Sequence, residues 1–300
     1  MAAYLALGVA EIESRAQQAL AGLGRCVGCA RACQSDRLTG PSSTCRTGRY
    51  ARVSSYFPHF GEEPPISGWR GSGTIFFSGC NLSCVYCQNH EISQGLEGVE
   101  VSDEELAQIM LQLQALGCHN INLVSPSHVV PQFLAALALA VPAGLRLPIV
   151  YNTGGYDSLA TLRLLDGIVS VYMPDAKYDD DQVGEQLSGI RHYPRVNRLA
   201  LKEMHRQVGD LVVDDQGVAT QGLLVRHLVL PEGLAGTAGV ARFLASELSA
   251  DTYCNVMSQY RPAYRASRFA PLRRRLTQEE YSTAVQAARS AGLWRGFPEG

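Results

Sequence analysis

Three cysteines, Cys80, Cys84 and Cys87, lie within eight residues in the spacing C-x3-C-x2-C. Soft thiolates held this close together select zinc, copper(I) or an iron–sulfur cluster. Zinc sites and ordinary cluster sites normally use four protein ligands, so three thiolates on one short loop leave a coordination position open. A metal centre with an open position can bind and activate a cofactor.

This loop, residues 80–87, resembles the signature of the radical S-adenosylmethionine (SAM) enzymes, C-x3-C-x-aromatic-C, with Tyr86 at the aromatic position. The resemblance implies a [4Fe–4S] cluster on the three cysteines, SAM bound to its fourth iron, and cleavage of SAM to a 5′-deoxyadenosyl radical. It also implies that Tyr86 packs against the cluster and the adenine. The run 74–77 directly precedes the loop and is typical of a buried strand. The alternatives are a zinc loop and a redox-sensitive cysteine cluster.

Composition limits the class of protein. The chain has 300 residues, 46% of them hydrophobic and 18% charged, which is typical of a globular protein with a large core. Its net charge of −2 argues against binding to nucleic acid or to an anionic membrane. We expect no secretion signal, since the first basic residue is Arg15, and no apolar run reaches the ~18 residues of a membrane span. Nine cysteines in such a chain indicate metal ligation in a reducing cytoplasm.

Strands alternate with helices from Thr74 onward, which indicates a parallel sheet. Six strands are too few for a closed eight-fold barrel. The expected fold is therefore α/β with a partial (β/α)6 barrel, which the radical SAM resemblance also implies. The predicted strands are 74–79, 121–124, 148–152, 168–174, 223–230 and 253–258. Two capping boxes predict helix starts, one at Ser102 and one at Thr277.

The chain divides into three predicted parts. Residues 1–72 form an N-terminal helix and a loop-rich, cysteine-rich metal-binding segment, residues 73–260 form the barrel, and residues 261–300 form an arginine-rich stretch and a helix. The N-terminal segment has the spacing C-x2-C-x3-C-x11-C, which suits a closed zinc site or a second [4Fe–4S] cluster. Cysteines that stay reduced without metal are the third alternative. These cysteines are Cys26, Cys29, Cys33 and Cys45.

Polar residues follow the predicted strands at their carboxyl ends, where parallel α/β folds gather their chemistry. Ser125 and Ser127 follow the second strand, where many radical SAM enzymes have a Gly-Gly-Glu stretch, and their hydroxyls are candidate acceptors for SAM. A plain helix N-cap is the alternative for Ser127. Arg226 lies inside the apolar fifth strand and needs an anion or a hydrogen-bonding partner, either SAM or a structural carboxylate. Since strands have a period of two, Arg226 and His227 face opposite sides, and we expect Arg226 to face the interior.

Two further strand ends resemble segments of glycyl-radical-enzyme activases. Asn152-Thr153 and Asp175-Ala176-Lys177 are similar to the Asp-Thr-Asn-Gly and Asp-x-Lys segments of those enzymes. The resemblance implies a monovalent cation near the SAM carboxylate, held by Asn152, Thr153, Met173 and Asp175, with Lys177 near SAM. The region 59–260, through its runs 61–68, 71–77 and 87–93, looks like proteins similar to pyruvate formate-lyase activating enzyme.

These resemblances imply a radical SAM oxidoreductase that activates a glycyl-radical enzyme, with flavodoxin or ferredoxin as its reductant. One alternative is a radical enzyme that modifies a small molecule or another macromolecule. The other is a non-enzymatic iron–sulfur redox sensor or electron-transfer protein. The aromatic and acidic segment 56–63 either lines the substrate side or is a packing linker. The arginine-rich stretch 261–275 is either a solvated surface or a docking site for an acidic partner.

Overall fold

The computed structural model describes residues 2–40 and 43–297. The strands are β1 (Ala51–His59), β2 (Ser72–Phe77), β3 (Val99–Val101), β4 (Ile121–Val124), β5 (Ile149–Thr153), β6 (Val171–Pro174), β7 (Val212–Val213), β8 (Ala219–Leu228) and β9 (Tyr253–Met257). The α-helices are α1 (Val9–Ala21), α2 (Pro64–Ser67), α3 (His90–Ser93), α4 (Asp103–Ala115), α5 (Val130–Ala140), α6 (Leu159–Leu164), α7 (Asp181–Ser188), α8 (Tyr193–Val208), α9 (Thr237–Phe243) and α10 (Gln278–Ser290). Short 3-10 turns cover Ala3–Ala6, Gly22–Arg25, Pro126–His128, Pro231–Gly233, Ala266–Arg268 and Ala270–Arg273, and a π-helix covers Leu244–Leu248.

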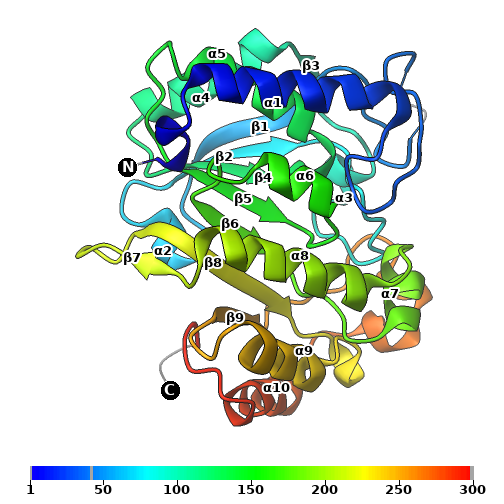
Figure 1. The fold of residues 1–300 in the computed structure, drawn as a ribbon. Helices are drawn as coiled ribbons and strands as arrows, with labels where there is room; N and C mark the ends of the chain where they lie inside the picture. Colours follow the sequence, from blue (N-terminus) through cyan, green and yellow to red (C-terminus); the bar gives the residue numbers. More distant parts are fainter. Residues whose placement is uncertain (1, 41–42, 298–300) are drawn as a thin grey trace.

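Six of the described strands are parallel and neighbour one another in the order β2, β4, β5, β6, β8 and β9. They correspond to the six predicted strands, so the predicted α/β fold is confirmed. Figure 1 shows α6 and α8 in front of this sheet, α1 across its top, and α9 and α10 at its bottom. Both predicted capping boxes are present, at Ser102 with Glu105 and at Thr277 with Glu280.

The sheet continues beyond the parallel strands in a way that the sequence analysis did not anticipate. Residues 1–72 were expected to be loop-rich after their first helix, but β1 is a nine-residue strand within them, antiparallel to β2. The strand β3 then pairs with β1, and β7 pairs with β8. Burial along β1 alternates only over its first four residues, so its sequence shows little of the period-two pattern that marks a strand. Its pairing depends on β2.

Side chains alternate between the two faces of the parallel strands. On the outer face Leu123 and Tyr151 pack with the apolar helix α5, in the larger core of the protein. On the inner face Val171 and Leu224 pack with Ile66 of α2 in a smaller core. The inner face therefore continues from Leu224 to Arg226, as period two requires.

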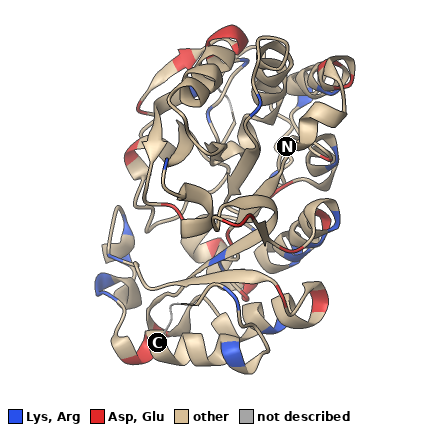
Figure 2. Cartoon of the chain, turned by 90° about the vertical axis from the view of Figure 1, so that its left-hand side faces the viewer, with Lys and Arg blue, Asp and Glu red and all other residues tan. Residues whose placement is uncertain are grey.

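In the view of Figure 2, basic and acidic residues are interspersed over the helices. Within residues 2–40 and 43–297, no helix combines the length and the apolar composition that crossing a membrane requires.

Candidate active site at the carboxyl ends of the strands

A cavity of about 290 Å³ lies at the carboxyl ends of the parallel strands. It brings together residues that are far apart in the sequence, because parallel strands end at the same edge of a sheet. The predicted site residues that line it are Cys80, Cys84, Tyr86, Cys87, Ser125, Asn152, Thr153, Asp175, Lys177 and Arg226. Of the other predicted residues, Ser127 lies behind this lining, and the side chain of Met173 packs in the inner core below it.

Three charged side chains form a compact group in this cavity. Asp175 accepts from Lys177 Nζ at 2.5 Å through one carboxylate oxygen and from Arg226 Nε at 3.1 Å through the other. A bridge between β6 and β8 places Asp175 directly opposite Arg226 in register. Burial alone would raise the pKa of Asp175, but the charges of Lys177 and Arg226 outweigh it and hold the pKa below its usual value.

This arrangement bears on the predicted monovalent cation. Both oxygens of Asp175 already accept from cationic side chains, so a cation at this point would compete with Lys177 and Arg226 for the carboxylate. The cation held by Asn152, Thr153, Met173 and Asp175 stays a prediction. Lys177 and Arg226 keep further N–H donors that can bind a ligand carboxylate or hydroxyl.

The helix α8 connects the loop after β5, which carries Gly154 and Gly155, to the loop after β6, which carries Asp175 and Lys177. The Tyr193 hydroxyl accepts from the backbone N–H of Lys177 at 2.9 Å and lies 3.0 Å from the carbonyls of Gly154 and Asp175. The Asn197 amide donates to the carbonyl oxygens of Gly155 and Asp175, both at 2.9 Å. Sequence reasoning missed both residues, because nothing in a helical stretch marks which side chains will reach a strand end.

Buried hydroxyl groups form hydrogen bonds with side chains of the cysteine loop (residues 80–87). Ser188 Oγ lies 3.0 Å from Cys84 Sγ and 2.7 Å from the Tyr178 hydroxyl. The Tyr178 hydroxyl lies in turn 2.5 Å from the Tyr86 hydroxyl. Tyr86 is thus tied to Cys84 through a chain of buried hydroxyls. Its ring also packs edge-on against Tyr260, with ring centroids 6.0 Å apart.

Asn152 and Thr153 differ in whether their side chains already form hydrogen bonds within the protein. The Thr153 hydroxyl donates to the Asp157 carboxylate at 2.7 Å and lies 2.9 Å from Ser127 Oγ. Burial raises the pKa of Asp157, against the effect of these hydroxyls. Ser127 is therefore bonded to Thr153, and its side chain does not cap a helix. Among the described residues Asn152 has no side-chain hydrogen bond, so its amide is available to a ligand in the cavity.

The two residues whose orientation was predicted from strand period lie as expected. Arg226 lines the cavity, whereas His227 bonds on the other face to the Ala176 carbonyl at 2.6 Å and to Thr237 Oγ1 at 2.8 Å. His128 is buried, and its Nε2 lies 2.9 Å from the Ser78 carbonyl. Burial lowers its pKa to about 4, so this imidazole is neutral at physiological pH.

Two acids from the segment before the barrel reach its interior. Glu62 accepts from the Asn122 amide at 3.1 Å and lies 3.6 Å from Arg226 Nη1. Glu63 accepts from Asn255 at 2.8 Å, while its second oxygen and the Asn122 Oδ1 atom are buried with no partner among the described residues. The segment 56–63 thus places Glu62 beside Arg226, and its role on the substrate side stays a prediction.

Comparison with known proteins identifies the family. The model of the radical SAM superfamily matches residues 74–208, which include the cysteine loop and the strand ends from β2 to β6. The chain belongs to the radical SAM superfamily. Membership implies a [4Fe–4S] cluster and SAM as cofactors.

Two relatives illustrate the similarity. The Uncharacterized protein MJ0674 of Methanocaldococcus jannaschii is 32% identical over 276 residues, which cover 89% of this chain and 75% of that protein. A radical SAM methyltransferase from Sphaerobacter thermophilus has a similar fold, with a TM-score of 0.50 and 17% identity. That match covers 73% of this radical SAM chain and 64% of the methyltransferase chain, just under two thirds.

The three loop cysteines of this radical SAM protein fit a cluster better than a single metal ion. A four-iron cluster is larger than an ion, so its ligands surround a volume instead of a single point. Cys80, Cys84 and Cys87 border one shared cavity, and thiolates are the usual ligands of such clusters.

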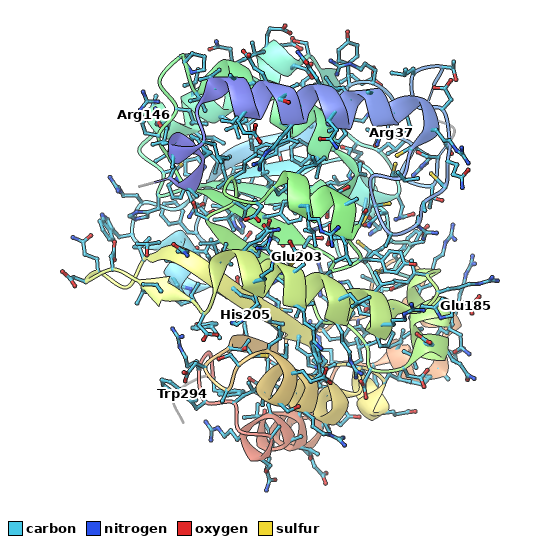
Figure 3. The ribbon with its side chains drawn as sticks, in the orientation of Figure 1. Arg37, Arg146, Glu185, Glu203, His205 and Trp294 are labelled. Atoms are coloured by element: carbon cyan, nitrogen blue, oxygen red, sulfur yellow. The ribbon has the colours of Figure 1, made fainter. Side chains whose placement is uncertain are left out.

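The N-terminal cysteines lie directly behind the cysteine loop. All four border one small cavity, together with Arg37, Asn81 and His128. Arg37, labelled in Figure 3, is buried and donates to the Thr47 carbonyl at 2.8 Å, with Cys26 Sγ at 3.6 Å. Burial raises the pKa of Cys29 to about 12, and the nearby Cys45 and Cys26 thiols add to the effect.

The packing between the two cysteine segments is close enough to exclude a side chain. Gly79, which precedes the cysteine loop, has a φ of +83°, and a Cβ there would lie 2.4 Å from the Cys45 carbonyl oxygen. Glycine is therefore required at this position both for its conformation and for the close approach.

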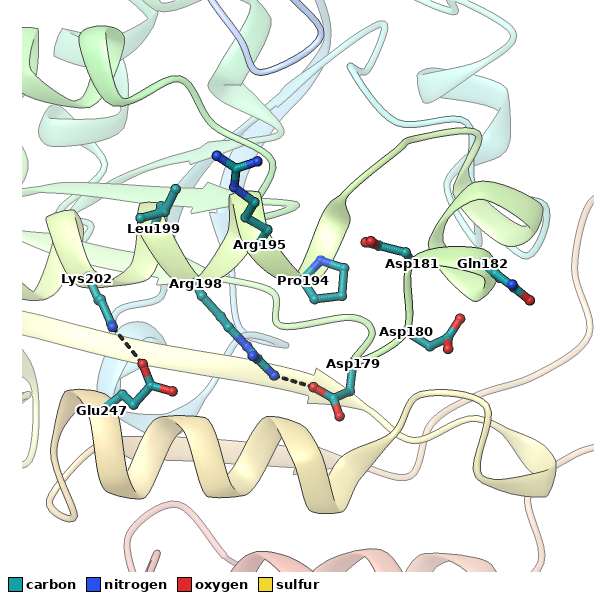
Figure 4. A pocket seen from close by; sticks show the side chains of 10 residues that line it. All are labelled: Asp179, Asp180, Asp181, Gln182, Pro194, Arg195, Arg198, Leu199, Lys202 and Glu247. Carbon is teal, nitrogen blue, oxygen red and sulfur yellow. Dashed lines mark hydrogen bonds and ion pairs between the residues drawn. The ribbon is translucent and has the colours of Figure 1, made fainter.

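A larger hollow lies elsewhere, between α8 and the region of α9 (Figure 4). Its volume is about 760 Å³, but it contains none of the strand-end residues. Its charges are largely paired, as between Lys202 and Glu247 at 2.7 Å and between Arg198 and Asp179. This hollow is not part of the candidate active site.

Proposed function

We propose that this protein is a radical SAM enzyme that abstracts a hydrogen atom from a glycine of a partner protein, as glycyl-radical-enzyme activases do. The observation that carries the proposal is the cavity that joins the three loop cysteines to the buried group of Asp175, Lys177 and Arg226. When bound, the cluster and SAM supply a 5′-deoxyadenosyl radical. An iron–sulfur redox sensor or electron-transfer protein would have no need of such a ligand pocket.

The residues of the chain supply binding and orientation. Lys177 and Arg226 offer positive charge and N–H donors to an anionic ligand group, and Asp175 keeps both side chains in place. Asn152 offers an unpaired amide from the neighbouring strand end. Tyr193 and Asn197 hold the loops between these residues, so that the ligand meets a fixed set of donors.

The size of the cavity supports a macromolecular substrate. Pockets for small molecules usually measure about 300–1,000 Å³, and this cavity of about 290 Å³ lies at the lower limit. The cavity would have to hold both the cluster and SAM, which leaves little room for a further molecule. A substrate that reaches the site from outside, such as a loop of a partner protein, avoids this restriction.

The test has two stages. The anaerobically reconstituted and reduced protein should form 5′-deoxyadenosine from SAM, and the variant C80A/C84A/C87A should form none. The same reaction mixed with pyruvate formate-lyase should then give the electron paramagnetic resonance signal of a glycyl radical. Formation of 5′-deoxyadenosine without a glycyl radical would contradict the activase proposal while leaving radical SAM chemistry in place.

A second candidate, radical modification of a small molecule, is favoured by the Asn152 amide, which lines the cavity and has no hydrogen-bond partner among the described residues. The two candidates differ in what accelerates formation of 5′-deoxyadenosine, either a glycyl-radical enzyme or a low-molecular-weight fraction of cell extract.

We also propose that the N-terminal cysteines bind a second metal centre, since all four border one cavity. A closed site of four thiolates suits zinc or a second cluster. Quantitative iron, sulfide and zinc analysis should show the corresponding loss in a variant with Cys26 and Cys29 replaced by serine. Unchanged metal content in that variant would contradict the proposal.

A further inference from the structure

Residues 261–275, here called the arginine segment, form the most basic stretch of the chain. They follow β9 and contain six arginines and no acidic residue, although the whole chain has a net charge of −2. All six are exposed: Arg261, Arg265, Arg268, Arg273, Arg274 and Arg275.

The arginine segment lies against the cysteine loop. The backbone N–H of Arg265 donates to the Val85 carbonyl at 2.8 Å, and Val85 directly follows Cys84. The ring of Tyr264 stacks on His90, just beyond the loop, with centroids 5.0 Å apart. The segment is thus part of the surface next to the residues that would hold the cluster.

The inward side of the segment is apolar and anchored. Ala266 and Leu272 are buried in the same apolar group as Cys84 and Tyr86. The Tyr260 hydroxyl donates to the Leu272 carbonyl at 2.7 Å. This packing fixes the backbone, so the arginines are presented outward on an ordered surface.

Most of this positive charge is not neutralised by the protein. Arg274 forms an ion pair with Glu280 at 2.7 Å. Over the described ranges, Arg261, Arg268 and Arg275 have no ion pair. Arginines needed only for stability would be expected to meet carboxylates, since unpaired like charges repel one another.

We propose that the arginine segment is the docking surface for a small acidic one-electron carrier of the flavodoxin or ferredoxin type. The inference rests on the proposed function, because it assigns the route by which that site is reduced. The carrier gives up one electron, which the cluster gains, and no bond forms or breaks at the surface. Transient redox complexes bury little area and depend on complementary charge for fast encounter, which this surface provides.

A basic surface can also bind the phosphates of nucleic acid. The position beside the cysteine loop favours the carrier, since electron transfer requires the two centres to approach closely and nucleic-acid binding does not. Binding to RNA is therefore one outcome that the experiment must separate.

The test is the charge reversal R261E/R268E in the reconstituted holoenzyme. Stopped-flow measurements would give the second-order rate constant for reduction by flavodoxin hydroquinone and by reduced ferredoxin. At low ionic strength we expect this rate constant to fall at least about tenfold with flavodoxin or with ferredoxin, whichever is the carrier of this protein. A change of that size is typical of lost electrostatic steering. The difference should shrink as salt is added, because salt screens exposed charges.

The matched control is R163E/R195E, which makes the same change of charge at exposed positions on α6 and α8. Its rate with the carrier should stay within about twofold of the wild type. Dithionite is a small anionic reductant that needs no docking, so at high ionic strength, where surface charge is screened, it should reduce all three proteins equally. Equal loss in both charge-reversal variants, or no loss in R261E/R268E with either carrier, would overturn the proposal.

Binding measurements separate this proposal from the proposed function. Calorimetry with oxidised flavodoxin and ferredoxin reports docking without turnover, and R261E/R268E should weaken it even if the protein forms no 5′-deoxyadenosine. A variant that loses binding to single-stranded RNA while it retains binding to both carriers would overturn the inference in favour of nucleic acid.

Discussion

The carboxylate of Asp175 is the most informative group to perturb, because it pairs with two cationic side chains at once. Its side chain is 14% exposed, and those of Lys177 and Arg226 are 15% and 21% exposed. The variant D175N keeps the shape of the side chain and removes its charge. It leaves Lys177 and Arg226 close together in a largely buried site, where Glu62, 3.6 Å from Arg226 Nη1, is the remaining ion-pair partner of Arg226 among the described residues.

D175N should lower the free energy of unfolding by a large amount. Removal of one partner from a buried ion pair typically costs about 3–5 kcal/mol, because the remaining charge is uncompensated. The pairs here are partly exposed and share one carboxylate, so we expect about 3 kcal/mol, near the lower limit of that range. Urea unfolding at pH 7 measures this loss. SAM affinity should also fall, since Lys177 and Arg226 would no longer be held in position.

The pH dependence follows from the depressed pKa of Asp175. A carboxylate with a lowered folded-state pKa contributes stability above its unfolded pKa of about 3.9 and loses it as the pH falls through the folded value. The difference in free energy of unfolding between wild type and D175N should therefore be largest at pH 7 and should decrease only below about pH 4.

Two comparisons make this prediction refutable. The control D166N breaks an exposed ion pair with Arg206, at 42% and 55% exposure, and should cost no more than about 1 kcal/mol. A double-mutant cycle of D175N with R226M should show a coupling free energy of at least about 1 kcal/mol. A loss in D175N no larger than in D166N, together with zero coupling, would refute the assigned role of Asp175.

Three further predictions concern the surroundings of the site. Y193F removes the hydroxyl that bridges Lys177 and Gly154. The free energy of unfolding should therefore fall by about 1–3 kcal/mol, and SAM should bind more weakly. Unchanged urea unfolding and an unchanged SAM titration would contradict this. G79A should lower the free energy of unfolding by about 1–3 kcal/mol more than the control G117A. Both glycines have a φ of +83°, but only Gly79 has a carbonyl oxygen where its Cβ would lie. Equal losses in urea unfolding would argue against the close packing of the two cysteine segments. Burial raises the pKa of Glu62, so its contribution to stability is greatest below about pH 4.3 and declines as the pH rises through the folded value. Unfolding measured from pH 4 to 7 should then show E62Q gaining stability relative to wild type, and a flat difference would count against the burial of this acid.

The sequence by itself determined the features that depend on local patterns. The cysteine spacing and the preceding strand indicated the family, because both lie within a short stretch of chain. The six parallel strands followed from alternation of apolar runs and helices, and the orientation of Arg226 followed from a strand period of two. Once the strands were placed, the rule that parallel strands end at one edge brought Asn152, Asp175 and Lys177 into one cavity.

The tertiary structure decided the contacts between segments that are distant in the sequence. The pairing of β1 with β2 was missed, since β1 has a weak alternation and depends on its partner for its hydrogen bonds. Asp175 and Arg226 are 51 residues apart, and the bridge between β6 and β8 makes them partners. Tyr193 and Asn197 reach the strand ends only because α8 packs beside them.

Packing between distant segments also explains the position of the arginine segment. Its charge is visible in the sequence, but its position over the cysteine loop is set by the burial of Tyr260, Ala266 and Leu272 next to Cys84. Local patterns determine which side chains a strand or helix presents, because they depend on the geometry of one element. Which side chains meet depends on the packing of several elements, and only the folded chain determines that.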